Sequence, residues 1–405
     1  MPARIYLAAL AALLLTMTAC VKYDPTPTPK PSRVLLVYVG TDNNLSGLEQ
    51  EKLDALCNGW TGKPTDHIIV YRDTQGADAR LIEISNLAPG ELPREIAAYG
   101  RENSASGDVF SRVINDVISQ YKADSYGLLI FSHASGWLPA GALNNPNAFS
   151  ANSPHSRSII TDGTSEMALA DFASAIPDGV FDYIVFEACF MAGIEVAYEL
   201  RHKADCIFAS SAEIVHPGFA PVYSSATGQL FGQRLEGFGQ RVFNHTLTYA
   251  GDSPQRSAAY SVIHTAALES LSSFIGENCD FSQSVKIGDI QHFDRNAHRL
   301  FFDFEDYYGR LLPNDAKRAE LSRLVAACIQ WKAATDEFMT QQPGYNGFQI
   351  EKHSGLTTYI PQPEFPALNA AYNNTSWAKA IDINLDNVGT AELSLTSTPR
   401  HHDAV

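Results

Sequence analysis

Residues 181–196 read FDYIVFEACFMAGIEV and decide the fold of this chain. The apolar, β-branched and aromatic start of this stretch is typical of a buried strand, and Cys189 lies just past its end. Residues 126–137 read YGLLIFSHASGW, a second buried-strand pattern that ends on His133 before a Ser-Gly turn. Parallel strands of an α/β sheet end at the same edge, where the reactive crevice lies. We therefore expect His133 and Cys189 to open into one cleft.

This pairing of residue types suits nucleophilic catalysis. Cysteine reacts as its thiolate, and an isolated thiol is only weakly ionised at neutral pH. A histidine within hydrogen-bond reach lowers the thiol pKa and later protonates the leaving amine. A helix predicted over residues 191–202 would add positive potential from its N-terminal amides. The alternative is that Cys189 fills the apolar core and that His133 is satisfied by its neighbours.

Strand and helix patterns alternate from residue 34 onward, which predicts an α/β fold with a mainly parallel sheet flanked by helices. The predicted strands cover residues 34–39, 67–71, 80–84, 126–133, 181–186 and 206–210. The predicted helices are a polar one that follows the turn at residues 41–44, and those over 108–121, 166–176 and 191–202. Beyond residue 237 the pattern is mostly helical, with helices around 266–274 and 318–338 and strands at 258–263 and 356–360.

The first twenty residues resemble an export signal, because a single arginine precedes an apolar segment too short to span a bilayer. This segment ends in Met-Thr-Ala-Cys, which resembles a bacterial lipobox and predicts that Cys20 is acylated. Four alternating prolines follow, and they suit an extended tether that holds a domain off a membrane. The alternative is a disordered tail after ordinary secretion.

The composition excludes some functions. A formal net charge of −16 and the lack of a basic run argue against nucleic-acid binding. No second stretch is apolar and long enough to cross a membrane, so we expect membrane contact through the lipid anchor only. The six cysteines show neither a disulfide framework nor a metal-binding spacing, and five remain once Cys20 is acylated. An odd number leaves at least one free thiol.

Several motifs, taken in order, resemble the clostripain-like cysteine peptidases, which belong to the same fold group as caspases, legumain and gingipains. The matching motifs are YVGTDNNL, YGLLIFSHASGW, FDYIVFEACFMAGIEVAYEL, ADCIFASSAEIVHPGF, SGLTTYIP and YNNTSWAKA. They span residues 34 to about 380, and their order is more specific than any one of them.

The resemblance implies a caspase-like core, a dyad of His133 and Cys189, and cleavage of protein or peptide substrates after arginine or lysine. It also implies that the amides of Ala134 and Cys189 hold the oxyanion and that Glu187 lines the specificity pocket. Some relatives use calcium, but the sequence itself predicts no cofactor and no metal site. The implied organisation is a lipoprotein signal (1–20), a tether (21–33), a caspase-like catalytic domain (34–255), a C-terminal region packed on the core (256–390) and a tail (391–405).

Two residues depart from the family pattern. Glu187 replaces the usual aspartate, which shortens the pocket by about one methylene. Ala134 replaces the usual glycine after the histidine, and the oxyanion hole survives unless the backbone there needs a positive φ. Glu187 has an alternative as a strand-end carboxylate that faces water, and Glu213 is either part of the pocket or a solvated charge. We interpret Asp42 and Asn44 as turn and helix-cap residues.

The sequence thus predicts an exported, lipid-anchored cysteine endopeptidase. A polar loop over residues 138–158 contains one arginine, Arg157, so the bond between Arg157 and Ser158 is the candidate for self-cleavage. A competing hypothesis is a lipoprotein that keeps this fold only to bind peptides or a partner. A third is an esterase or amidase that uses the same dyad on small molecules. The sequence does not specify the oligomeric state.

Overall fold

The computed structural model describes residues 32–88, 91–147, 159–232, 234–249, 256–295, 298–340 and 346–383. The predicted signal, Cys20, most of the tether, the candidate cleavage site at Arg157 and Ser158, and the tail all lie outside these ranges. Within them, no helix combines the length and apolar character needed to span a membrane.

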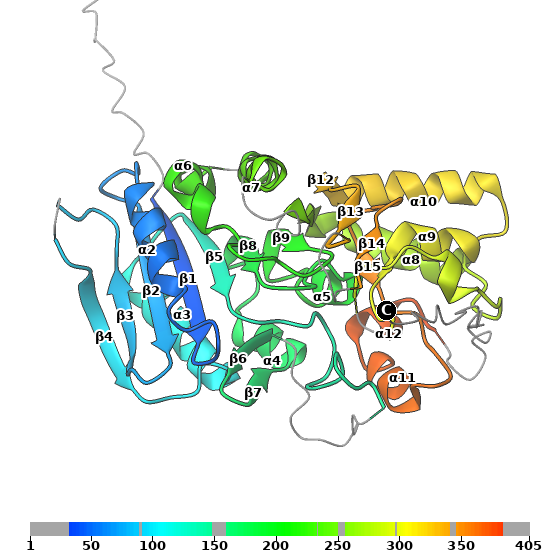
Figure 1. The fold of residues 1–405 in the computed structure, drawn as a ribbon, viewed down its shortest axis with the longest axis horizontal. Coiled ribbons are helices and arrows are strands. Elements are labelled where there is room, and N and C mark those ends of the chain that lie inside the picture. The colour runs from blue at the N-terminus through cyan, green and yellow to red at the C-terminus, as the bar shows by residue number, and fades with distance from the viewer. Residues whose placement is uncertain are drawn as a thin grey trace, which may run out of the picture. The chain divides into compact units, whose positions relative to one another are not determined.

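In the described part of the chain, nine strands form one sheet (Figure 1). In sheet order, they are β12 (Ile329–Ala334), β10 (Ala259–His264), β9 (Ala204–Ser210), β8 (Phe181–Glu187), β5 (Ser125–Phe131), β1 (Arg33–Thr41), β2 (His67–Thr74), β3 (Ala79–Glu83) and β4 (Arg94–Gly100). The five strands from β9 to β2 are parallel, and two antiparallel strands extend each edge. This confirms the predicted mainly parallel α/β fold.

Helices cover both faces of the sheet. They are α2 (Glu49–Asn58), α3 (Gly107–Gln120), α4 (Leu169–Ala175), α5 (Ile194–Glu199), α6 (Ala220–Leu230), α7 (Glu236–Thr248), α8 (Leu268–Asn278), α9 (Phe304–Arg310), α10 (Asp315–Cys328), α11 (Pro366–Tyr372) and α12 (Ser376–Ala380). Three two-stranded pairs complete the structure: β6 (Ile159–Asp162) with β7 (Ser165–Met167), β11 (Phe302–Asp303) with β15 (Thr357–Thr358), and β13 (Glu337–Phe338) with β14 (Phe348–Gln349).

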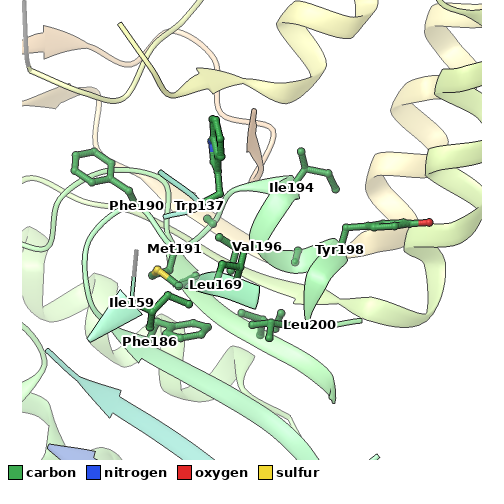
Figure 2. Packing of buried hydrophobic residues seen from close by; sticks show 14 of the residues in the cluster. Trp137, Ile159, Leu169, Phe186, Phe190, Met191, Ile194, Val196, Tyr198 and Leu200 are labelled. Carbon is green, nitrogen blue, oxygen red and sulfur yellow. The ribbon is translucent and has the colours of Figure 1, made fainter. Parts of the chain in front are cut away.

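The side-chain alternation of the strands divides the core into two layers. In β1, Leu35, Val37 and Val39 pack with α2, α6 and α7, whereas Leu36 and Tyr38 face the layer that contains α3, α4 and α5. Figure 2 shows part of the second layer, where side chains from β8, the turn after Cys189 and α5 meet. Burial on both faces explains why the central strands read as continuous apolar runs.

The sheet order follows the chain in two blocks. Strands β1 to β5, all before residue 132, form one half of the sheet, and β8, β9, β10 and β12 form the other. The two halves meet where β5 pairs with β8. The C-terminal region therefore contributes β10 and β12 to the same sheet.

Several predicted helices differ from the structure, three of them in ways that bear on the fold. Within the span 166–176, the chain first completes β7 and only then forms α4. The stretch 318–338 is helical only to Cys328, because residues 329–334 pair with β10 as an edge strand on which Trp331 stacks with Phe208. The polar helix expected directly after Asn44 begins at Glu49, so neither Asp42 nor Asn44 caps it.

Candidate active site

The pairing of β5 with β8 sets the position of both predicted reactive residues. The two strands are parallel, with Phe131 opposite Glu187, and His133 and Cys189 each lie two residues further along. Both side chains line one cavity of about 280 Å³. The structure thus brings together two residues that the sequence separates by 56 positions.

A sharp turn after β8 holds Cys189. Its neighbour Phe190 has a φ of 61°, a strained value for a residue with a side chain, and is fixed by an N–H bond to Ala212 O (3.0 Å). The Phe190 ring stacks on Phe301 with 4.3 Å between centroids, in the same buried layer as Met191 (Figure 2). Packing on both sides of the turn therefore offsets the backbone strain and fixes the thiol at the cavity.

The environment of Cys189 favours the neutral thiol. Its pKa is raised to about 11, mainly by burial and to a smaller extent by Glu213, against the opposing effects of the Ile214 N–H bond to Sγ (3.4 Å) and of Arg295. The predicted helix over 191–202 does not assist, since α5 begins only at Ile194 and contains six residues. The expected contribution of helix amides to the thiolate was therefore wrong.

His133 is half-buried, and burial lowers the pKa of its imidazole. Its Nε2 lies 2.6 Å from Asn44 Oδ1. Because an amide oxygen only accepts, Nε2 donates, and the neutral ring keeps its lone pair on Nδ1. Asn44 is thus a histidine partner rather than the cap residue that the sequence suggested.

Asn44 is held in place by the turn that follows β1. Asn43 Nδ2 donates to Thr161 O (2.6 Å), and Gly163 N donates to Asp42 O (2.6 Å). Ser132 Oγ connects the same region, since it donates to Gly40 O (2.6 Å). The β1 turn, the histidine segment and the β6–β7 hairpin therefore form one hydrogen-bonded unit around His133.

Glu187 lines the cavity but does not face open water. Its carboxylate pairs with Lys52 on α2, and it accepts hydrogen bonds from Phe219 N (2.7 Å) and from Tyr223 Oη (2.6 Å). Only 2% of its side chain is exposed. The alternative of a water-facing strand-end carboxylate is therefore wrong, and a substrate that reaches Glu187 meets a group that already has partners.

Glu213 also lines the cavity, in the loop after β9. It forms a bidentate ion pair with Arg295, at 2.5 Å to Nε and 2.9 Å to Nη2. Ion pairs of this geometry are both strong and directional. Glu213 is therefore a structural anchor for the loop at the cavity, and the alternative of a merely solvated charge was wrong.

The backbone at Ala134 needs no glycine. Described non-glycine residues with positive φ are Asn86, Ile160, Phe190, Met339 and Asp382, and Ala134 is not among them. Ala134 instead forms an antiparallel bridge with Ile159. Among the residues that the structure describes, no three His, Cys, Asp or Glu side chains are grouped so as to hold a metal ion.

Sequence reasoning missed the roles of Asn44, Lys52 and Arg295. The signal for Asn44 was its place at the end of β1, which is adjacent to β5 in the sheet. Lys52 and Arg295 gave no local signal, because each reaches the cavity from an element distant in sequence from the residue it pairs with.

The fold agrees with comparisons to known proteins. Residues 37–277 match the model of the clostripain family. The chain belongs to the clostripain family of C11 cysteine proteases. Clostripain from Hathewaya histolytica is 26% identical over 213 residues, which is 46% of this chain and 40% of that protein. The matched segment thus spans less than half of that relative.

Two solved structures of family members are similar over most of the chain. An inactive zymogen of a C11 protease from Parabacteroides distasonis has a TM-score of 0.75 at 26% identity, covering 87% of this chain and 99% of that chain. A secreted C11 cysteine protease from Bacteroides thetaiotaomicron, solved with an irreversible peptide inhibitor, has a TM-score of 0.73 at 25% identity, with the same coverages. Both support the resemblance drawn from the sequence motifs.

The thiol pKa gives a test that needs no substrate. Because burial raises the Cys189 pKa to about 11, its thiolate fraction at pH 8 should be about 100-fold below that of a thiol of pKa 9. Alkylation by iodoacetamide, followed at Cys189 by mass spectrometry, should be slow at pH 8 and accelerate steadily as the pH rises. The Cys189→Ala variant identifies the label at the other cysteines. A fast rate that does not change between about pH 6 and 9 would instead show a preformed thiolate.

Proposed function

We propose that this protein is an exported cysteine endopeptidase whose Cys189 and His133 act as a dyad. The observation that carries the proposal is the parallel, in-register pairing of β5 with β8, which brings both side chains to one cavity. A neutral imidazole and a neutral thiol that line the same cavity suit proton transfer on substrate binding rather than a standing ion pair.

In this mechanism Cys189 Sγ attacks the scissile carbonyl carbon while His133 Nδ1 takes the thiol proton. The amides of Cys189 and Ala134 would donate to the developing oxyanion. The protonated imidazole then gives its proton to the leaving amine, and the C–N bond breaks to leave a thioester. Water, deprotonated by His133, hydrolyses the thioester and restores the thiol. Asn44 keeps the imidazole of His133 in the tautomer that these proton-transfer steps require.

The proposed preference is for a basic side chain before the scissile bond. Three glutamates line the cavity, Glu51, Glu187 and Glu213, against one lysine. Because Glu187 and Glu213 are already paired with Lys52 and Arg295, the net excess at the cavity is one carboxylate, which favours arginine or lysine over an acidic residue.

The dyad hypothesis predicts that Cys189→Ala and His133→Ala each reduce kcat/KM for arginyl peptides by at least about 1,000-fold, because each removes a reacting group. Fluorogenic peptide turnover measures the loss, and thermal unfolding checks that the fold persists. Asn44→Ala removes only the histidine partner, so kcat should fall with KM nearly unchanged and with an altered pH profile.

Cys57→Ala, on α2 but outside the cavity, is the matched control and should keep full activity. Undiminished cleavage by Cys189→Ala would refute the dyad. Equal cleavage after leucine and arginine by the wild type would refute the basic preference. Turnover of acyl esters with no peptide cleavage would point to an esterase or amidase, and peptide binding with no turnover of either would point to a binding protein.

Self-processing is part of the proposal. A relative with similar structure is an inactive zymogen, and Arg157 is the only lysine or arginine in residues 138–158 of this chain. Wild-type protein should therefore acquire an N-terminus at Ser158, whereas Cys189→Ala should remain intact. N-terminal sequencing of both distinguishes the outcomes, and Arg157→Gln tests whether activity depends on the cut. A fully active wild-type chain that stays intact would contradict a requirement for processing.

Membrane anchoring through Cys20 completes the proposal, and the secreted relative from Bacteroides thetaiotaomicron supports export. Two acyl chains or more give stable membrane attachment, so the wild type should fractionate with membranes. Cys20→Ala should move the protein to the soluble fraction on cell fractionation. A mature N-terminus elsewhere, free of acyl chains by mass spectrometry, would rule the anchor out.

A further inference from the structure

The ion pair between Lys52 and Glu187 has no role in the proposed catalytic steps. It is deeply buried, with 8% of the lysine side chain and 2% of the glutamate side chain exposed. Both residues line the cavity that contains Cys189. Burying two charges costs desolvation energy that their attraction often only balances, so stability alone is a weak reason for such a pair.

The surroundings hold the lysine cation inside the cavity. Besides Glu187, Lys52 Nζ donates to Pro217 O (3.3 Å) and lies 4.4 Å from the centroid of the Phe131 ring. A carboxylate, a carbonyl and an aromatic face are the groups that recognise a substrate cation. This part of the cavity is therefore already a complete site for an ammonium group, and the chain itself fills it.

Gly218 brings the covering loop onto this pair. Its φ is +66°, and a Cβ at this position would collide with Glu187 Oε1 and lie 3.3 Å from Lys52 Nζ. The next residue, Phe219, donates its N–H to Glu187 Oε1. The loop thus closes tightly on the carboxylate of Glu187.

We infer that Lys52 is a specificity-determining residue, an internal cation that a basic substrate side chain must displace from Glu187. This inference rests on the proposed preference for basic residues. A second ammonium or guanidinium group beside Lys52 would be repelled by it. If the substrate cation instead takes the place of the Lys52 ammonium, Glu187 stays paired. The lysine has a flexible four-carbon stem, and Glu51, which is exposed, offers a carboxylate on the same cavity.

Binding of benzamidine tests this inference without turnover. In a Cys189→Ala background, Lys52→Met removes the internal cation, so Glu187 should bind the amidinium at least about tenfold more tightly, the scale of one charge-assisted hydrogen bond. Isothermal titration calorimetry measures the affinity. Lys122→Met, a change at an exposed lysine, is the control and should bind like the parent.

Peptide turnover gives the second readout. In the active enzyme, Lys52→Met should raise the ratio of kcat/KM for arginyl over leucyl peptides by about the same factor. If Lys52→Met unfolds, Lys52→Gln takes its place in both measurements, because glutamine keeps a hydrogen-bond donor but carries no charge. Unchanged benzamidine affinity in a folded Lys52→Met or Lys52→Gln protein overturns the inference. Tighter benzamidine binding with no peptide cleavage by any form would overturn the proposed function and leave the role of Lys52 intact.

Discussion

The backbone pairing of β5 with β8 is the interaction on which the site depends. Hydrogen bonds between parallel strands fix the register, and a slip of one residue would turn every side chain to the opposite face. With Phe131 opposite Glu187, the chain leaves both strands at the same edge, and His133 and Cys189 follow at equal distance from it. The burial of both strands on each face makes this register the one that keeps the core intact.

The polar side chains at this edge of the sheet are paired with other side chains rather than left to face water. Glu187 has Lys52, Glu213 has Arg295, and His133 has Asn44, so each of these three groups on the cavity wall has a partner supplied by another element. Polar side chains that are already fixed by their partners before the substrate binds need little reorganisation when it does. The raised thiol pKa of Cys189 fits this arrangement, since Arg295 is paired with Glu213 and burial remains the largest effect on the thiol.

The sequence predicted the sheet, its central strands and the placement of His133 and Cys189 at one cavity, because apolar runs and strand ends are local signals. It did not predict that α2 begins at Glu49 or that β12 follows α10, since those boundaries depend on packing against distant elements. Glu187 illustrates the same limit. Its identity and strand-end position were readable, but its partner Lys52 is 135 residues away, so no local pattern indicates that the carboxylate is paired.

The division of the sheet into two consecutive blocks has a consequence for assembly. All strands on one side of the β5–β8 junction precede residue 132, and all strands on the other side follow residue 180. Any break of the chain between these points turns the junction into an interface between two molecules. Reassembly of the site after denaturation would then follow second-order kinetics, and recovered activity would depend on protein concentration. An intact chain would instead recover at a rate independent of dilution, because one polypeptide supplies both blocks.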